Sequence, residues 1–368
     1  MHVEGQPMRT IWHEDGLVRI IDQTWLPARL VIRDLPDVSA CAEAISTMRV
    51  RGAPLIGATA AWGMALAMQV DPSDTALDAA VDMLTATRPT AVNLRHALES
   101  MAAILAPLPA DQRAEAAADA AHAFCDDDVE INQSLGRHGL QLLREMAATK
   151  PAGEPLNILT HCNAGWLATV DRGTATAPIY AAHEAGIPVH VWVDETRPRN
   201  QGASLTCWEL GQEGIPHHLV ADNAGGHLMQ HGRVDLVLVG TDRTTRTGDV
   251  CNKIGTYLKA LAARDNDVPF WVALPTSTID FRLDDGMSIP IEERSAQEVL
   301  SFAGVDEGQV LRRLRVAPPG TAAVNPAFDV TPAHLVDGYI TEHGLVRRQD
   351  DRTADVFADL TQPGSPRC

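Results

Sequence analysis

The sequence lacks the cysteine pairs that mark disulfide frameworks and zinc sites. Its six cysteines are widely spaced, with no C-x-x-C pair among them, at positions 41, 125, 162, 207, 251 and 368. Neither a disulfide scaffold nor a zinc ribbon is indicated, and a reducing cytoplasm fits the chain best. The first five residues also lack the basic and apolar regions of a signal peptide.

Long apolar runs and basic stripes are missing as well. The most apolar stretch, residues 55–70, is too short to span a bilayer and predicts a buried helix. The formal net charge is −18, and no long basic stripe is present. This balance argues against nucleic acid or a membrane as partner. A phosphorylated small molecule is compatible with it, because a few arginines and lysines reverse the field inside one cleft.

Motifs for nucleotide cofactors are absent too. There is no G-x-G-x-x-G after a strand and no G-x-x-x-x-G-K-[ST]. Four histidines suggest a metal, and two of them have i, i+4 spacing, but no carboxylate or cysteine completes an ordered ligand set nearby. They lie at positions 217, 218, 227 and 231. We therefore expect chemistry without a metal or cofactor.

The N-terminal part of the chain has a helical pattern. Alternating segments at 10–12 and 17–22 predict strands of a small antiparallel sheet. Between residue 37 and about residue 146 the pattern is helical and rich in alanine. Helices are predicted at 41–50, 54–69, 75–86, 90–105, 111–125 and 127–146. The segment 150–155 holds two prolines and one glycine and is typical of a linker.

After this linker the pattern changes to apolar runs separated by stretches of helical length. The runs lie at 156–160, 188–193, 217–221, 234–239 and 269–274. Repeated βαβ units of this kind predict an α/β fold with a Rossmann-like, doubly wound, mostly parallel sheet. At 368 residues the chain is long enough for two domains. We expect a smaller helical domain with a short antiparallel sheet at 1–150 and the Rossmann-like catalytic domain at 151–368.

A thiol and a carboxylate each come directly after a predicted strand. Cys162 lies in the segment Thr-His-Cys-Asn-Ala-Gly after the strand at 156–160, and Asp242 lies in Gly-Thr-Asp-Arg after the strand at 234–239. Parallel strands place the residues at their carboxyl ends along one sheet edge, where ligand sites collect. The structural alternatives are a small buried thiol and a helix-capping aspartate. Together the two residues suggest acid–base chemistry across one cleft.

Arginines stand before two predicted helix starts. Arg51, Gly52 and Ala53 precede Pro54, which suits a first helical turn, and the free N–H groups there favour an anion. Arg88 has the same relation to a proline and to the helix at 90–105. The alternative for each is a helix-capping turn with a solvated arginine. Two such starts in one domain favour a shared anion site.

Further candidates lie after other strands of the predicted sheet. The charged loop 194–203 places Arg197 and Gln201 at the same edge as the thiol. Asn252 and Lys253 are expected to begin the helix after Asp242, where a lysine opposes the helix dipole. An anion facing Lys253 would offset this unfavourable interaction with the dipole.

Several of these segments together closely resemble the 5-methylthioribose-1-phosphate isomerase family, over about residues 10–345. The family shares its fold with ribose-1,5-bisphosphate isomerase and with regulatory subunits of initiation factor 2B. The matching segments are 51–54, 160–165, 194–198, 240–243, 248–256, 289–294 and 325–332.

The resemblance implies roles for particular residues. Cys162 and Asp242 fall on the family's catalytic pair. The substrate-binding positions fall on Arg51, Gly52, Ala53, Arg88, Gln201, Asn252 and Lys253. It also implies a metal-free homodimer that converts 5-methylthioribose 1-phosphate to 5-methylthioribulose 1-phosphate in methionine salvage.

The sequence leaves two other functions open. One is an isomerase of another 5-substituted ribose 1-phosphate, such as 5-deoxyribose 1-phosphate or ribose 1,5-bisphosphate, and the other is a non-catalytic regulatory subunit. No extra basic cluster for a second phosphate stands out, which favours an uncharged 5-substituent. A regulatory subunit needs neither the thiol nor the carboxylate.

Overall fold

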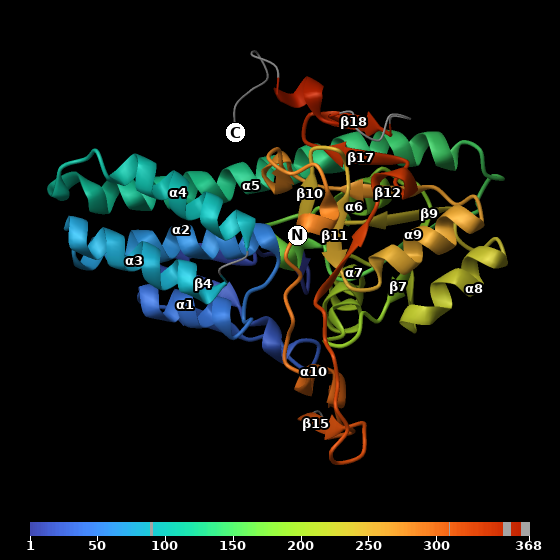
Figure 1. Ribbon diagram of the computed structural model, residues 1–368, viewed down its shortest axis with the longest axis horizontal. Coiled ribbons are helices and arrows are strands. Elements are labelled where there is room, and N and C mark those ends of the chain that lie inside the picture. The colour runs from blue at the N-terminus through green and yellow to red at the C-terminus, as the bar shows by residue number, and fades with distance from the viewer. Residues whose placement is uncertain (89–90, 309, 349–354, 362–368) are drawn as a thin grey trace. The chain divides into compact units, whose positions relative to one another are not determined.

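The computed structural model describes the chain except residues 89–90, 309, 349–354 and 362–368 (Figure 1). It contains two compact units, which we describe separately. The first unit comprises Met1–Asn132 and Trp166–Gly173, and the second comprises Gln133–Gly165 and Thr174–Cys368. We expected a domain boundary at residue 150, where the sequence pattern changes. The compact units instead divide the chain between Asn132 and Gln133, inside the helix Ala110–Ala147.

The first unit combines small antiparallel sheets with helices. β3 (Ile11–Glu14), β4 (Leu17–Ile21) and β5 (Ile32–Leu35) form a three-stranded sheet, and β1 (His2–Val3) pairs with β2 (Gln6–Pro7). The helices are α1 (Val38–Ser46), α2 (Ala53–Val70), α3 (Asp74–Thr87) and α4 (Val92–Leu105). The predicted strands and helices of this region are therefore present.

Two of the predicted helix boundaries were wrong. The first helix ends at Ser46 instead of residue 50, and Met48 has a left-handed backbone with φ of 60°. The helices expected at 111–125 and 127–146 are one helix, α5 (Ala110–Ala147). The aspartates at 126–128 are weak helix formers, but this segment contains no proline or glycine to break the helix.

The core of the first unit is centred on α2. This helix is made largely of alanine and other small or apolar residues, and α1, α3 and α4 pack around it. Among the described residues it is the one helix long and apolar enough to cross a membrane, and 72% of that stretch is buried. Its apolar character is explained by burial in this core.

The second unit contains a seven-stranded sheet with the order β18-β17-β12-β9-β6-β7-β8. The strands are β6 (Leu156–Thr160), β7 (Val189–Asp194), β8 (His217–Val220), β9 (Leu236–Val239), β12 (Phe270–Ala273), β17 (Gly338–Thr341) and β18 (Gly344–Arg347). All neighbours are parallel except β17 and β18. The doubly wound sheet is confirmed, and sequence analysis missed its last two strands.

Helices cover this sheet, as expected for parallel strands. α8 (Gly225–Gln230) and α9 (Thr256–Asp265) share a core with β6, β9 and β12. α6 (Ala177–Glu184) packs against the C-terminal part of α5, where a Cβ on Gly139 would lie 2.3 Å from Pro178 Cγ. The remaining helices are α7 (Cys207–Gln212) and α10 (Gln297–Leu300).

Smaller sheets complete the second unit. A four-stranded sheet has the order β13-β10-β11-β16, and β14 pairs with β15 in a hairpin. Their bounds are β10 (Arg243–Thr245), β11 (Val250–Lys253), β13 (Ile279–Asp280), β14 (Ser301–Val305), β15 (Leu311–Arg315) and β16 (Phe328–Thr331). In this sheet β11 carries the candidate residues Asn252 and Lys253, and the candidate Asp242 immediately precedes β10.

Candidate active site

The order of the strands reverses between β6 and β9. From β6 the chain proceeds through β7 to β8 on one side, then returns to add β9, β12 and β17 on the other. Ligands of open α/β sheets bind outside the carboxyl ends of the strands at such a switch point. Cys162 follows β6 by two residues and Asp242 follows β9 by three. The two predicted catalytic residues thus flank the switch point of one sheet.

The backbone of Cys162 is held in an unusual conformation. Its φ is 70°, a left-handed value uncommon for residues other than glycine. Its N–H donates to Thr196 Oγ1 at 2.8 Å, and its carbonyl accepts from Thr206 Oγ1 at 2.9 Å. Two buried hydroxyls therefore fix the peptide groups on both sides of this residue, which is 7% exposed. Strain held by its surroundings is typical of functional sites.

Asp242 is anchored through its backbone to the neighbouring strand β11. Its N–H donates to the carbonyl of Cys251 at 3.0 Å, and Thr241 Oγ1 donates to the same oxygen at 3.0 Å. Arg243 forms an ion pair with Asp280. Burial, and then the nearby charge of Asp242, raise the pKa of Cys251 to about 12. That thiol therefore stays neutral near pH 7.

Gln201 lies at the start of a π-helical segment, Gly202–Thr206, after β7. π-Helical segments often occur at functional sites. Its side chain is 7% exposed, and Oε1 has no hydrogen-bond partner among the described residues. A buried, unpaired amide oxygen is costly unless a ligand or water satisfies it, which supports a ligand contact. Arg197, in contrast, donates to the carbonyl of Val299 at 2.9 Å and so supports the protein framework.

Asn252 and Lys253 lie on strand β11, and the next helix begins at Thr256. The expectation that they open this helix, with Lys253 opposing its dipole, was wrong. Both side chains are buried: Asn252 Nδ2 donates to Thr256 Oγ1 at 3.0 Å, and Lys253 Nζ donates to the carbonyl of Ala327 at 3.0 Å. A buried ammonium is nevertheless a strong local source of positive charge for a bound anion.

The remaining predicted residues belong to the first unit. Gly52 caps α2 with φ of 93°, and a Cβ there would lie 2.4 Å from the carbonyl oxygen of Ala168, so only glycine fits. Arg51 precedes this cap and Ala53 is the first helical residue. Arg88 ends α3, and α4 begins at Val92 instead of residue 90; Pro89 and Thr90 lie outside the described residues. A shared anion site for these residues stays a prediction.

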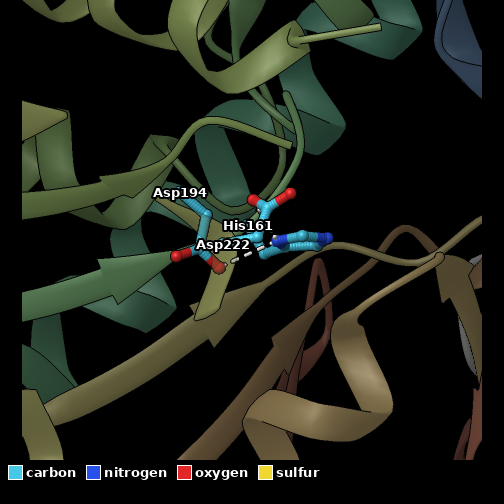
Figure 2. Close-up of side chains that lie close together, drawn as sticks. All are labelled: His161, Asp194 and Asp222. Atoms are coloured by element: carbon cyan, nitrogen blue, oxygen red, sulfur yellow. Dashed lines mark hydrogen bonds and ion pairs between the residues drawn. The ribbon is translucent and has the colours of Figure 1, made fainter. Parts of the chain in front are cut away.

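Sequence analysis assigned no role to His161, although the structure makes it the centre of a buried network (Figure 2). Its Nδ1 lies 2.9 Å from Asp194 Oδ2, and its Nε2 lies 2.8 Å from the carbonyl oxygen of Ile254. Lys259 Nζ lies 3.0 Å from the same Asp194 oxygen. The position of His161 beside Cys162 was the available signal, but its partners are remote in sequence.

His161, Asp194 and Asp222 are close enough together to suggest a metal site. Their surroundings favour a different interpretation. Both Asp222 oxygens accept backbone N–H groups, from Thr196 at 2.7 Å and Arg197 at 2.6 Å. The Lys259 ammonium already supplies a cation to Asp194. A metal ion would have to displace these donors, so the donor set fits an internal ion-pair network better than a metal.

A cavity of about 560 Å³ lies at the other edge of the sheet. Its lining includes Leu156, Asp235, Pro269 and Asp337, which stand at the amino ends of β6, β9, β12 and β17. Lys150 and Asp235 are paired there at 2.6 Å. This cavity is therefore separate from the carboxyl edge that carries Cys162 and Asp242.

Comparison with known proteins identifies the family of this chain. Residues 49–348 match the initiation factor 2 subunit family. The chain is 62% identical to the methylthioribose-1-phosphate isomerase of Rhodospirillum rubrum, over 94% of this chain and 90% of that protein. The crystal structure of 5-methylthioribose 1-phosphate isomerase from Pyrococcus horikoshii OT3 is 39% identical, with a TM-score of 0.82 over 96% of both chains.

A further structure carries a different functional description. The crystal structure of translation initiation factor eIF-2B, subunit delta, from A. fulgidus is 38% identical, with a TM-score of 0.78 over 93% of this chain and 96% of that chain. From the matched family, the identities and the shared fold, the chain belongs to the initiation factor 2 subunit family and, within it, to the methylthioribose-1-phosphate isomerases.

Proposed function

We propose that this chain converts 5-methylthioribose 1-phosphate to 5-methylthioribulose 1-phosphate, an aldose–ketose isomerisation in methionine salvage, with Cys162 and Asp242 as its acid–base pair. The observation that carries the proposal is the position of the two residues after β6 and β9, on either side of the switch point. The identity to methylthioribose-1-phosphate isomerases supports the choice of substrate.

The substrate carries a phosphate on C1, so its ring cannot open to a free aldehyde. Protonated Asp242 donates to the ring oxygen while the bond from C1 to that oxygen breaks, which leaves a hydroxyl on C4 and a cationic C1. The Cys162 thiolate removes the proton on C2, and C1 and C2 become an enol. The thiol then returns its proton to C1, and the C2 hydroxyl gives its proton to Asp242 as the ketone forms. Both residues are restored.

A hydride shift is the alternative route to the same product. The hydrogen on C2 moves to cationic C1 with its electron pair, and the Cys162 thiolate accepts the proton of the C2 hydroxyl. Proton exchange with solvent then returns Cys162 to the thiolate and Asp242 to the acid. The two routes differ in one observable, the entry of solvent deuterium at C1. Proton transfer through the thiol allows solvent deuterium to enter C1, whereas a direct shift does not.

Arg51, Gly52, Ala53 and Arg88 of the first unit are proposed as phosphate-binding residues. Gln201, Asn252 and Lys253 of the second unit are proposed as substrate-binding residues, with Lys253 as a further source of positive charge for the anion. Support comes from the start of α2, where Gly52 provides no side-chain cap for the free N–H groups, and from the buried lysine on β11. A charge-assisted hydrogen bond to phosphate contributes about 1.5–3 kcal/mol. Arg51→Ala is therefore expected to raise KM about tenfold or more, and an unchanged KM and kcat would contradict this placement.

The experiment is NMR of the purified protein with 5-methylthioribose 1-phosphate in D₂O, after treatment with EDTA. A new C2 ketone signal is the expected result, because the proposed chemistry uses no metal. Deuterium at C1 would support proton transfer. Absence of a ketone with this substrate, and its appearance with ribose 1,5-bisphosphate or 5-deoxyribose 1-phosphate, would reassign the substrate. Absence with all three would favour the regulatory function.

Substitutions test the acid–base pair. Cys162→Ser and Asp242→Asn should each lower kcat by about 10²–10⁴, because each removes a positioned proton-transfer group. Cys207→Ser and Asp265→Asn are the matched controls, since Cys207 is a half-exposed thiol on α7 and Asp265 an exposed carboxylate on α9. Activity within tenfold of wild type in both active-site variants would contradict the assignment.

We also propose that the chain is a cytoplasmic homodimer. Support for self-association comes from α9, where large apolar side chains at i, i+1 and i+4 are exposed. They are Tyr257, Leu258 and Leu261, with Leu258 64% exposed. Clustered exposed apolar residues are typical of interaction surfaces. The scattered cysteines support a reducing compartment.

A further inference from the structure

We propose that His161 is a positioning residue which, as an imidazolium, joins the three segments that carry the site residues of the second unit. The proposal rests on the proposed function for its consequences in catalysis. The three segments are the one that contains Cys162, the loop after β7 that leads to Gln201, and the end of β11 with Asn252 and Lys253.

The hydrogen-bond partners of His161 determine its proton count. Nε2 faces the carbonyl oxygen of Ile254 at 2.8 Å, and a carbonyl oxygen only accepts, so Nε2 carries a hydrogen. Nδ1 faces Asp194 Oδ2 at 2.9 Å, and a carboxylate also accepts. Two acceptors require two N–H donors, and an imidazole with both is an imidazolium.

The charges around the ring favour the same state. Three carboxylates face this region, from Asp194 on β7, Asp222 after β8 and Asp329 on β16, and the Lys259 ammonium on α9 lies 3.0 Å from Asp194. Burial raises the pKa of Asp329, and the backbone N–H groups of Gly255 and Tyr257, followed by the charges of His161 and Lys259, offset this rise only in part. A charged His161 reduces the imbalance among these groups.

Packing also fixes the position of the His161 ring. The side chain of His161 is completely buried. Gly255, with φ of 103°, lies against it, and a Cβ at that position would be 3.0 Å from both Cε1 and Nε2 of the ring. The turn between β11 and α9 therefore needs a residue without a side chain to approach the imidazole. This close approach sets the distance between the turn and the start of the Cys162 loop.

The network continues directly to the backbone of Cys162. Thr196 lies two residues after Asp194, and its Oγ1 donates to the Asp194 carbonyl at 3.0 Å and accepts from the Cys162 N–H. A shift of Asp194 would therefore move the hydroxyl that holds Cys162. A misplacement of about 1 Å costs about a hundredfold in rate at a positioned catalytic group. Loss of His161 should therefore lower kcat more than it weakens substrate binding.

Kinetics of two variants test the positioning role. H161F keeps a planar aromatic ring but lacks the two ring N–H donors. H161Q retains an N–H donor for one partner. We expect kcat to fall about a hundredfold in H161F and less in H161Q, with KM within about threefold of wild type and unchanged circular dichroism. His227→Gln, an exposed histidine on α8, is the control. A folded H161F variant with wild-type kcat would overturn the proposal, as would equal losses in kcat and affinity.

NMR of the wild-type protein with ¹⁵N-labelled histidine tests the charge without any substrate. The His161 ring, assigned by its absence in H161Q, is expected to show two protonated nitrogens up to pH 8. Asp194→Asn removes the facing negative charge and should return the ring to a neutral form at that pH. A neutral ring in the wild-type protein at pH 8 would overturn the imidazolium. This readout needs no turnover, so it stays decisive if the proposed substrate is wrong. Because the assignment uses H161Q, it also stays decisive if H161F does not fold.

Discussion

Individual residues in this protein hold backbone conformations that local sequence does not favour. Cys162, Thr196 and Asn200 all have left-handed φ values, of 70°, 65° and 59°, although none is a glycine. Each such residue costs about 1–3 kcal/mol, so its surroundings must stabilise it. At Cys162 the stabilising groups are the hydroxyls of Thr196 and Thr206. Three of the eight non-glycine residues with a left-handed φ in the described part of the chain thus lie in the two segments that carry Cys162 and Gln201.

The Thr196 hydroxyl provides a sharp test of this arrangement. Thr196→Val keeps the side-chain shape but leaves the Cys162 N–H without an acceptor, at a cost of about 1–3 kcal/mol. We expect kcat of this variant to fall at least tenfold, measured as steady-state turnover. Thr196→Ser retains the hydroxyl and is the matched control. Equal kcat in the valine and serine variants would show that the hydroxyl does not position Cys162.

Asp128 in the first unit makes stability depend on pH. It is buried, accepts a hydrogen bond from the Val170 N–H at 2.8 Å, and burial raises its pKa from 3.8 to about 7. The folded state therefore keeps a proton that the unfolded chain loses between about pH 4 and pH 7. The free energy of unfolding falls as pH rises through this window, by at most about 4 kcal/mol at about 1.36 kcal/mol per pH unit.

The Asp128→Asn variant should accordingly lose most of this pH dependence and be more stable than wild type at pH 8. The measurement is the urea midpoint of the protein at pH 5 and pH 8. Asp119→Asn, a carboxylate on the same helix that is not buried, should follow the wild type. If the urea midpoint shifts equally with pH in D128N and in the wild type, Asp128 is excluded as the source of the pH dependence.

At the scale of elements, sequence patterns located most helices and strands but not all their ends. The five predicted strands of the main sheet are present because continuous apolar runs suit parallel strands buried on both faces. The strands β17 and β18 were missed because each begins with a glycine and ends with a polar residue, so neither contains a continuous apolar run. Asn252 and Lys253 were assigned to a helix because these two residues of β11 pair with β16, which lies about 75 residues later in the sequence.

The contact between α5 and α6 is predicted to depend on Gly139. Alanine gains about 1 kcal/mol in helix propensity, but its Cβ would lie 2.3 Å from Pro178 Cγ and 3.3 Å from Ile340 Cδ1. Overpacking costs about 1–3 kcal/mol, so Gly139→Ala should lower the thermal midpoint. Gly211→Ala on α7 is the control, because its nearest neighbour is 3.9 Å away, and it should be neutral or stabilising. A stabilised G139A variant would contradict this packing.

At the scale of the whole molecule, the exposed apolar side chains of α9 allow a test of the proposed homodimer. Leu258→Glu places a charge in this patch and should shift the protein toward monomer in sedimentation-velocity measurements at micromolar concentration. Val70→Glu is the control, because Val70 is also exposed, at the end of α2 in the first unit. A monomeric wild type would exclude the homodimer, and an unchanged dimer in L258E would exclude α9 from its interface.

The sequence by itself determined the doubly wound class, the absence of nucleotide motifs and the positions of Cys162 and Asp242 after strands, since hydrophobic periodicity and the succession of segments along the chain can be read locally. Only the tertiary structure decided what surrounds these residues. His161, Asp194, Lys259 and Ile254 lie on four separate segments and meet because β6, β7 and α9 converge at one sheet edge. Hydrogen bonds between such distant residues leave no periodic signal, so the network that holds Cys162 became visible only in the folded chain.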